Sequence, residues 1–475
     1  MLTTNSAVKE SLVVCQNSQG EEFRAGLVRL TRYVAVFEIH NPALVVRLSE
    51  VLAHFQIVFQ DRTVYSGRAV VHNLVNAGLA MVCEVTLDEK AWMDVEFTAA
   101  MIANGKLREQ FGGFMQEWQK LYRVVPEYKV IIADLQSFLA DLRLWVDQVE
   151  VGLRASPVGE RAHLEQAVAE ELARPVIPCV NELFEKFETV AAPLADELRP
   201  AHRNYMRRQL HALVLCAPFA NRTFYKPLGY AGDYEMVNMI VRNQPEGETL
   251  FAKVVNTWFL RQPPAQAHRN RIDYLTQTLA SETLRISRAR RRARVFNLAC
   301  GSAHEAQKFL SESPLSGQIS LTLLDFNPET LQHVRASLEA IKRRSGCGTP
   351  IEYLKKSVQQ ILKESGRPAK RSVENQYDFV YCAGLFDYLS NQICQRLMNI
   401  LYDDWLAPGG LLVVTNVEPS NPLRNGMEHL LDWHLIYRTA PQLKSLSPDR
   451  AKPDAGRVRA DATGLNLFLE VRKPS

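Results

Sequence analysis

Two segments, Val295-Phe-Asn-Leu-Ala-Cys-Gly-Ser-Ala-His-Glu305 and Leu323-Leu-Asp-Phe-Asn-Pro328, give the clearest indication of the fold of this 475-residue chain. In the first, an apolar run meets a turn of small residues, which predicts a strand, a turn and then a helix. The second is also strand-like and ends at Asp325, at about the 20-residue interval expected of a ribose-binding carboxylate in a nucleotide fold. Together the two segments predict a nucleotide-binding α/β sheet.

The turn itself, Ala299-Cys-Gly-Ser-Ala303, lacks the glycines with which a GxGxxG motif lets the backbone approach a pyrophosphate. A nucleoside without a phosphate suits this turn, and S-adenosylmethionine (SAM) is the cofactor that we expect. Gly301 is the critical member, because a Cβ at this position would push into the ligand. Ala303 and the absent third glycine disfavour NAD. The alternative interpretation of the turn is a purely structural helix cap.

The residues predicted to bind the cofactor lie at the ends of three strands. Asp325 is expected to accept hydrogen bonds from the ribose hydroxyls, and capping of the following helix is its alternative role. Glu305 begins a helix, where a carboxylate is favourable on dipole grounds alone. Gly384 follows the apolar run Tyr377–Cys382 and would let the backbone approach the ligand. The predicted set is Asn297, Ala299, Cys300, Gly301, Ser302, Glu305, Asp325, Phe326, Ala383 and Gly384.

The periodicity of the apolar residues divides the chain into three regions. Short β-branched runs separated by turn residues predict a small antiparallel β-barrel over residues 1–105. Aromatic residues at helical spacing predict a helical linker or bundle over 106–217. Residues 218–475 begin with a lid segment at 218–290 and continue as alternating strands and helices. Among them we expect a helix from Gln392 to Asp403 that ends at Pro408-Gly-Gly410, followed by the fifth strand at Leu411–Asn416. This pattern predicts a doubly wound, Rossmann-like sheet ending in an antiparallel hairpin, the usual finish of a SAM-dependent methyltransferase.

Composition limits the class of protein. The chain is 47% hydrophobic and 23% charged, and its net charge of +4 is too small to indicate a nucleic-acid or membrane partner. The eight cysteines form no CxxC pair, and His429 and His434 are five residues apart, off a shared helix face, so we expect no metal site. The absence of a signal-like N-terminus and of an apolar run near the roughly 20 residues of a membrane span favours a cytoplasmic protein.

Two further segments combine polar and aromatic residues at high density. We interpret Arg222–Met236 as a lid that excludes water from the cofactor, in which Asp233 also suits a helix N-cap. The second of these segments, Glu418–Arg438, follows the fifth strand. Between the two segments, Asp387 and Tyr388 follow the fourth strand and would project over the methyl group. The predicted catalytic residues are Tyr230, Asp387, Tyr388 and Arg438, and the predicted substrate-binding residues are Tyr225, Lys226, Asp233, Arg424, Trp433, His434 and Tyr437.

Four segments resemble a bacterial family associated with biosynthesis of 3-hydroxypalmitic acid methyl ester, an extracellular quorum-sensing factor. They are Lys226-Pro-Leu-Gly-Tyr-Ala-Gly-Asp-Tyr-Glu235, Asn297-Leu-Ala-Cys-Gly-Ser302, Asp432-Trp-His-Leu-Ile-Tyr-Arg438 and Asn466-Leu-Phe-Leu-Glu-Val-Arg-Lys473. The match covers roughly Ala201 to the C-terminus. The resemblance implies a class I SAM-dependent methyltransferase that acts on a small molecule.

The N-terminal region resembles a PilZ domain, the bacterial receptor module for cyclic-di-GMP. Gly67-Arg-Ala-Val-Val-His-Asn-Leu-Val-Asn-Ala-Gly78 is similar to its (D/N)xSxxG segment, with Asn73 and Gly78 in place. Val75 replaces the serine, however, and Arg24, Arg29 and Arg32 do not have the RxxxR spacing. Since guanine and phosphate recognition relies on paired arginines, these departures weigh against cyclic-di-GMP as a ligand.

The acceptor of the methyl group is predicted to be an oxygen, most simply that of a carboxylate such as a 3-hydroxy fatty acid. A carboxylate is already ionised at neutral pH, so an O-methyltransferase acting on it needs no general base. Lys226, Arg424 and Arg438 are the candidate cations that would hold it. A hydroxyl or amine acceptor would instead require a base; the candidates are His304, Asp387 and His434.

The remaining alternative is a signalling protein. In it the barrel would respond to cyclic-di-GMP or to a protein partner, and the methyltransferase fold would serve only as a SAM-binding scaffold. Intact Asp325 and Gly301 argue against such a degenerate cofactor site. The pattern carries no signal for the oligomeric state.

Overall fold

A computed structural model describes residues 12–17, 19–20, 22–39, 46–59, 62–76, 81–93, 105, 107–109, 111–113, 115, 124–289, 291–364, 376–452 and 454–475. The chain forms two compact units. The first comprises Met1–Ala140, Thr189–Leu215 and Phe224–Gly229, and the second comprises Asp141–Glu188, Cys216–Thr223 and Tyr230–Ser475. The two units therefore divide between them the helical region predicted at 106–217.

The first unit contains a closed barrel with the strand order β1-β2-β3-β6-β5-β4, in which every neighbouring pair is antiparallel. Side chains alternate between the buried interior and the surface, as in β3, so that Phe37, Phe55 and Tyr65 fill the core. This confirms the small antiparallel barrel; Gly78 of the PilZ-like segment lies outside the described residues. The strands are β1 (Leu12–Gln16), β2 (Glu22–Leu30), β3 (Val34–Ile39), β4 (Val51–Phe59), β5 (Arg62–Asn76) and β6 (Met81–Leu87).

Helices follow the barrel, as the sequence predicts. In the second unit α8 packs on α4: the Trp258 indole donates a hydrogen bond to Asn181 Oδ1 (2.8 Å), and its ring lies 4.6 Å from that of Phe184. The ion pair of Lys253 with Glu165 joins the same two helices. The helices are α3 (Pro126–Arg154), α4 (Val158–Ala191), α5 (Arg199–Val214), α6 (Pro218–Tyr225), α7 (Tyr234–Arg242), α8 (Leu250–Leu260) and α9 (Pro263–Ser287).

The second unit is built on a seven-stranded sheet with the order β12-β13-β11-β10-β7-β8-β9. Strands β7 to β11 run parallel, and β13 is antiparallel to both of its neighbours, β11 and β12. The doubly wound sheet with a closing hairpin is thus confirmed. The strands are β7 (Ala293–Leu298), β8 (Ile319–Asp325), β9 (Ile351–Lys355), β10 (Tyr377–Cys382), β11 (Leu406–Val417), β12 (Gly456–Ala460) and β13 (Asn466–Arg472).

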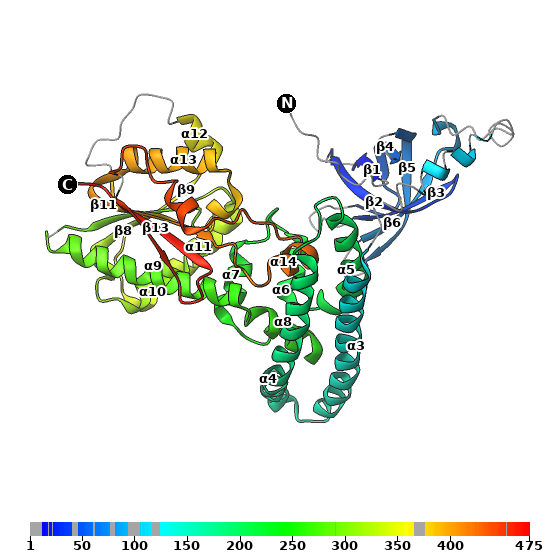
Figure 1. The fold of residues 1–475 in the computed structure, drawn as a ribbon, viewed down its shortest axis with the longest axis horizontal. Helices are drawn as coiled ribbons and strands as arrows, with labels where there is room; N and C mark the ends of the chain where they lie inside the picture. Colours follow the sequence, from blue (N-terminus) through cyan, green and yellow to red (C-terminus); the bar gives the residue numbers. More distant parts are fainter. Residues whose placement is uncertain are drawn as a thin grey trace. The chain divides into compact units, whose positions relative to one another are not determined.

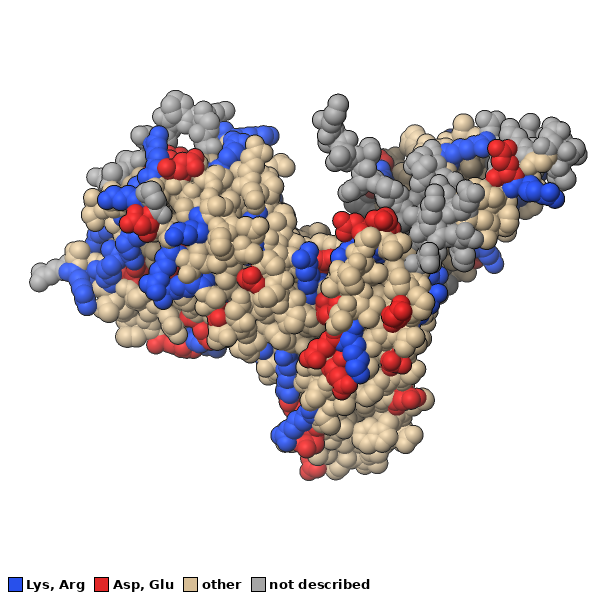
Figure 2. Space-filling model, viewed as in Figure 1, with Lys and Arg blue, Asp and Glu red and all other residues tan. Residues whose placement is uncertain are grey.

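Both faces of this sheet are covered, so that all six residues of β10 are buried. Helices α9 and α10 lie on one face and α12 and α13 on the other (Figure 1), and each face has its own apolar core. The remaining helices are α10 (His304–Glu312), α11 (Pro328–Ser345), α12 (Val358–Glu364), α13 (Asn391–Ile400), α14 (Arg424–Leu430) and α15 (Ala440–Lys444). On the face drawn in Figure 2, basic and acidic side chains are interspersed.

One boundary differs from the sequence prediction. The helix expected to reach Asp403 ends at Ile400, a π-helical turn covers Leu401–Trp405, and β11 begins at Leu406 rather than at Leu411. The reason is a bulge in the pairing with β10, where Tyr377 faces Leu406 but Phe379 faces Leu411. The Pro-Gly-Gly sequence inside β11 marks this bulge and not the end of a loop.

The order of the strands fixes where a ligand can bind. The chain begins at β7 in the middle of the sheet, extends to β9 at one edge, and then crosses back to β10 on the other side of β7. In such sheets the crevice at the carboxyl ends of the two strands that flank the reversal is the usual ligand site. Here it lies between the ends of β7 and β10.

Candidate active site

The turn after β7 is held in an unusual backbone conformation. Ala299, Gly301 and Ala303 have φ values of 56°, 52° and 48°, in the left-handed region that costs alanine free energy. The Cys300 N–H donates to the carbonyl of Leu324 (3.0 Å), which ties the turn to the end of β8. No atom lies within 4 Å of the position that a Cβ at Gly301 would take. The turn therefore borders open space that a ligand could enter.

Asp325 ends β8 directly beside this turn. Its Oδ2 accepts a hydrogen bond from the Gly301 N–H (3.1 Å), and its Oδ1 accepts one from the Asn327 N–H (3.0 Å). Burial raises the pKa of its carboxyl, and these N–H groups oppose that shift. The N-cap of α11 is Asn327, whose side chain accepts from Glu329 N–H (2.8 Å), so the capping role considered for Asp325 belongs to its neighbour.

Asn297 and Glu305 form a buried network under the turn. Glu305 Oε1 accepts hydrogen bonds from Asn297 Nδ2 (3.0 Å) and from the Tyr381 hydroxyl (2.9 Å). Burial raises the pKa of Glu305. The Asn297 side-chain oxygen is buried and has no hydrogen-bond partner among the described residues. Asn297 and Glu305 thus support the turn, and the Asn297 side-chain oxygen is the acceptor that remains without a hydrogen bond in the described residues.

The turn after β10 is the second wall of the crevice. Gly384 has a φ of 91°, which favours glycine, and its N–H donates to Thr415 Oγ1 (2.9 Å). A Cβ at Gly384 would lie 3.1 Å from Nη1 of Arg271, a residue of α9. The glycine is therefore required by the backbone conformation and by the close approach of this guanidinium.

Asp387 and Tyr388 lie in the short 3-10 turn Phe386–Tyr388 that follows. Asp387 Oδ1 accepts from the Val417 N–H (2.8 Å), and burial raises the pKa of its carboxyl to about 7, although Arg271 and Arg438 oppose the shift. The Tyr388 hydroxyl accepts a hydrogen bond from the indole N–H of Trp433 (3.0 Å).

Arg438 holds this turn in place. Its buried guanidinium donates to the carbonyls of Phe386 (2.7 Å) and Leu389 (2.6 Å) and to the side chains of Asn391 (2.9 Å) and Asn416 (2.5 Å). All three of its nitrogens are thereby engaged. In this position the guanidinium holds the segment that carries Asp387 and Tyr388, and the catalytic role predicted for Arg438 stays a prediction.

The predicted lid reaches both sides of the crevice. The Tyr230 ring lies 5.6 Å from that of Phe326, next to Asp325. A Cβ at Gly232 would lie only 2.8 Å from the Tyr388 hydroxyl oxygen. Asp233 Oδ1 caps α7 by accepting from the Met236 N–H (2.9 Å) and from Arg222 (2.8 Å).

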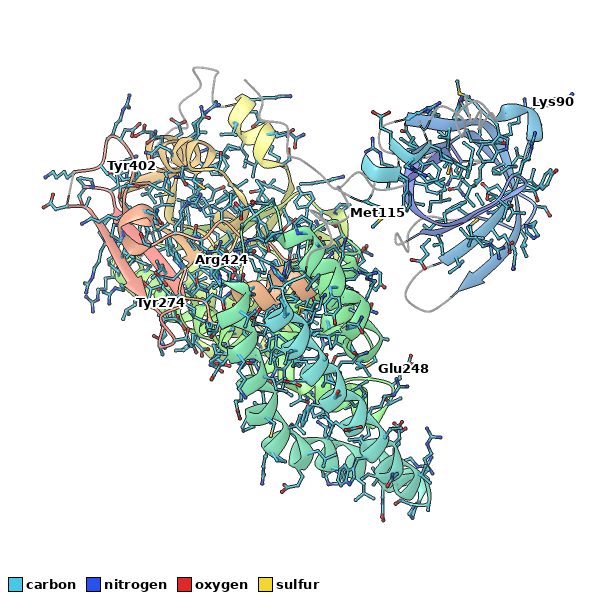
Figure 3. All side chains as sticks on the ribbon, turned by 45° about the vertical axis from the view of Figure 1, so that its right-hand side comes forward. Lys90, Met115, Glu248, Tyr274, Tyr402 and Arg424 are labelled. Carbon is cyan, nitrogen blue, oxygen red and sulfur yellow. The ribbon has the colours of Figure 1, made fainter. Side chains whose placement is uncertain are left out.

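The other predicted substrate residues are scattered. Arg424, labelled in Figure 3, forms an ion pair with Glu428 (3.1 Å), and its guanidinium lies 4.7 Å from the Tyr437 ring. His434 is half exposed and faces Asp432 at 3.3 Å. Tyr225 and Lys226 belong to the first unit. Their predicted contacts with a substrate stay predictions.

An apolar cavity of about 60 Å³ lies in the second unit. Its walls come from α4, α6, α7, α8, α9, β11, α14 and β13. Trp433 connects it to Tyr388 through their hydrogen bond. The Asn466 side-chain oxygen, on a residue that lines the cavity, is buried without a partner among the described residues. The aromatic and aliphatic lining includes Phe184, Phe219, Trp258, Met427, Leu430 and Trp433.

Two residues of α9 escape the sequence analysis. His268 lines the cavity and donates its Nδ1–H to the Pro264 carbonyl (2.9 Å), and burial lowers the pKa of its ring to about 3. Arg271 lies one turn further along, facing Gly384. The available signal is their i, i+3 spacing on the face that also buries Ile272 and Leu275. A histidine and an arginine beside such an apolar stripe require a partner or a function.

Two negative findings concern the described residues alone. Their helices include none with the length and apolar character needed to cross a membrane. Their His, Cys, Asp and Glu side chains form no group of three or more that could hold a metal ion.

No protein-family model and no curated protein matches the chain. Solved structures similar to it include a possible exported protein from Bordetella parapertussis, with 19% identity over 68% of this chain and 100% of that one, at a TM-score of 0.41. Another is magnesium protoporphyrin IX methyltransferase from Synechocystis with bound S-adenosylhomocysteine (SAH). It has 9% identity over 50% of this chain and 93% of that one, at a TM-score of 0.33. A third is an N-methyltransferase from Bradyrhizobium japonicum in complex with SAH. It has 16% identity over 51% of this chain and 98% of that one, at a TM-score of 0.29.

Proposed function

We propose that the second unit is a SAM-dependent methyltransferase that methylates an oxygen of a small molecule, namely the carboxylate of an acid such as a 3-hydroxy fatty acid. The observation that carries the proposal is the meeting of Gly301 and Asp325 at a hydrogen-bond distance of 3.1 Å, at the carboxyl ends of β7 and β8. Gly384 completes the crevice at the end of β10. The product would be a methyl ester.

The residues of the crevice fit a nucleoside with an amino-acid group. Each carboxylate oxygen of Asp325 accepts one backbone hydrogen bond and retains a second lone pair that can accept from a ribose hydroxyl. The open space at Gly301 leaves room for the ligand, and the turn offers no glycine-rich cradle for phosphate. Bound SAM would supply an electrophilic methyl group. Tyr230 and Phe326 would cover the nucleoside end.

The acceptor is assigned from the surroundings of Tyr388. Because this hydroxyl already accepts from Trp433, its own proton is available to donate to a carboxylate oxygen of the acceptor. Because the ordinary pKa of a tyrosine is about 10, Tyr388 keeps this proton at neutral pH. A carboxylate needs no base, and the protein then acts by alignment and exclusion of water.

The apolar cavity accounts for the rest of the acceptor. This cavity of about 60 Å³ has an aliphatic and aromatic lining, which suits the apolar chain of such an acid. The unsatisfied oxygen of Asn466 is an acceptor that a hydroxyl on the chain would satisfy. A role in quorum sensing rests on the family resemblance alone, as does regulation through the PilZ-like barrel.

The test combines binding with product analysis. Calorimetry with SAH should show binding by the wild type and at least tenfold weaker binding by Asp325→Ala, since hydrogen bonds to a charged group contribute about 1.5–3 kcal/mol each. The control is Asp273→Ala, at an exposed residue of α9. Incubation with labelled SAM and 3-hydroxy fatty acids should then give a labelled ester that alkali hydrolyses.

Two outcomes contradict the proposal. Equal affinity of Asp325→Ala and the wild type for SAH would remove the ribose assignment. A labelled product that resists alkali would instead identify an ether or an amine, and with it a reaction that requires a general base. Calorimetry with cyclic-di-GMP tests whether the barrel binds this ligand.

A further inference from the structure

Arg271 is a buried cation that forms no hydrogen bond or close ion pair within the described part of the chain. Its exposure is only 8%, yet its guanidinium makes no hydrogen bond and no ion pair of 4.0 Å or less with the residues that the structure describes. Arg438, the other buried arginine of this region, donates four hydrogen bonds. Because a buried unpaired charge is costly, a guanidinium left in this state is suited to receive an anion.

The position of Arg271 places this anion in the crevice. Its Nη1 lies 3.1 Å from the position of a Cβ on Gly384, at the end of β10. Two carboxyl groups interact with it electrostatically: that of Asp387, in the turn after β10, and that of Glu305, at the start of α10 after β7. The guanidinium therefore lies between the ends of the two strands where the order of the sheet reverses.

The crevice has a direction. Asp325, at the end of β8, marks the ribose end, and the open turn at Gly301 lies next to it. A nucleoside amino acid that starts at Asp325 and passes this turn directs its amino-acid group toward β10. The acceptor carboxylate is assigned to Tyr388 and Trp433, on the side of the apolar cavity.

We propose that Arg271 binds the carboxylate of the amino-acid part of the cofactor, an inference that rests on the proposed function. The planar guanidinium can donate two parallel hydrogen bonds to a carboxylate. Asp387, which interacts electrostatically with Arg271, has oxygens that can accept hydrogen bonds from the ammonium group of the same ligand. A cation and an acid side by side match a zwitterion.

The experiment compares two ligands that share the nucleoside thioether. SAH carries the amino-acid group, whereas 5′-methylthioadenosine lacks it. Arg271→Gln should weaken SAH binding about 10–100-fold, the loss expected for charge-assisted hydrogen bonds, and should change the affinity for methylthioadenosine by less than about twofold. Arg271→Lys should retain part of the SAH affinity, since it keeps the charge but loses the planar fork.

The controls separate the alternatives. Asp325→Ala should lower the affinity for SAH and for methylthioadenosine alike. Arg288→Gln, at the exposed end of α9, should lower neither affinity. Unchanged SAH affinity of Arg271→Gln with a raised KM for the acceptor would overturn the inference and assign Arg271 to the acceptor carboxylate. An equal loss for both ligands would also overturn it. Failure of the wild type to bind SAH would instead contradict the proposed function.

Discussion

The contact between Gly232 and Tyr388 makes the placement of the lid testable with a single methyl group. A Cβ on Gly232 would lie 2.8 Å from the Tyr388 hydroxyl oxygen, 3.7 Å from Met236 Cε and 3.9 Å from Trp433 Cζ2. Ordinary contacts begin at 3.4 Å, so Gly232→Ala requires a displacement of roughly 0.6 Å or more between the lid and Tyr388.

The expected cost follows from the role of Tyr388. Misplacement of a reacting group by about 1 Å can cost around 100-fold in rate, so Gly232→Ala should lower kcat for methyl transfer about 10–100-fold. The affinity for SAH should change little, since Tyr388 is assigned to the acceptor. Transfer of label from SAM to the acceptor gives kcat, and calorimetry gives the affinity. Gly317→Ala, where nothing lies within 4 Å of the new Cβ, is the matched control.

A double mutant tests whether the contact of the new methyl group with the Tyr388 hydroxyl causes the loss of kcat. Tyr388→Phe removes the oxygen that the new methyl group would meet, so in the Tyr388→Phe background Gly232→Ala should cost less than about threefold. Additive losses from Gly232→Ala and Tyr388→Phe would refute the reasoning, because they would show that the methyl group acts elsewhere. A wild-type rate in Gly232→Ala would show that the lid is not packed on Tyr388 during turnover.

Three further predictions follow from the same contacts. Arg438→Met should lower the free energy of unfolding by about 3–5 kcal/mol in denaturant titrations, whereas the exposed pair lost in Arg424→Met should cost less than about 1 kcal/mol; equal losses would contradict the role given to Arg438. The Asp387 carboxyl has a pKa raised from 3.8 to about 7, so the folded state binds the extra proton and stability should fall as pH rises from about 4 to 7. Asp387→Asn should flatten that fall in the unfolding temperature, and an unchanged pH profile would show that another group is responsible. Leu430→Trp, in the wall of the apolar cavity, should shorten the longest fatty acid that is methylated, and an unaltered chain-length profile would place the chain elsewhere.

Much of the fold could be predicted from local pattern. The six-residue apolar run of β10 indicates a strand buried on both faces, and the alternation in β3 indicates a barrel wall. The start of β11 escaped prediction because its Pro-Gly-Gly bulge has the composition of a turn. Pairing with β10, which is set by residues distant in the sequence, overrides that local signal.

The candidate site is harder to predict, because it depends on contacts between distant segments. Asp325 and Gly301 follow strands, and parallel strands bring their ends together, so the pair can be expected from sequence. Arg271 lies 113 residues before Gly384, and no local pattern indicates that they touch. Similarly, no local pattern indicates that the Arg438 guanidinium donates to the carbonyls of Phe386 and Leu389.

The guanidinium of Arg438 joins the turn after β10 and the adjoining start of α13 to the end of β11, which follows α13 in the sequence. If the proposed activity is correct, a genetic screen for loss of methylation would therefore recover this arginine as readily as Tyr388, the residue proposed to contact the acceptor. The amount of folded protein in each mutant, rather than its turnover, would distinguish a residue that stabilises the fold from one that takes part in the reaction.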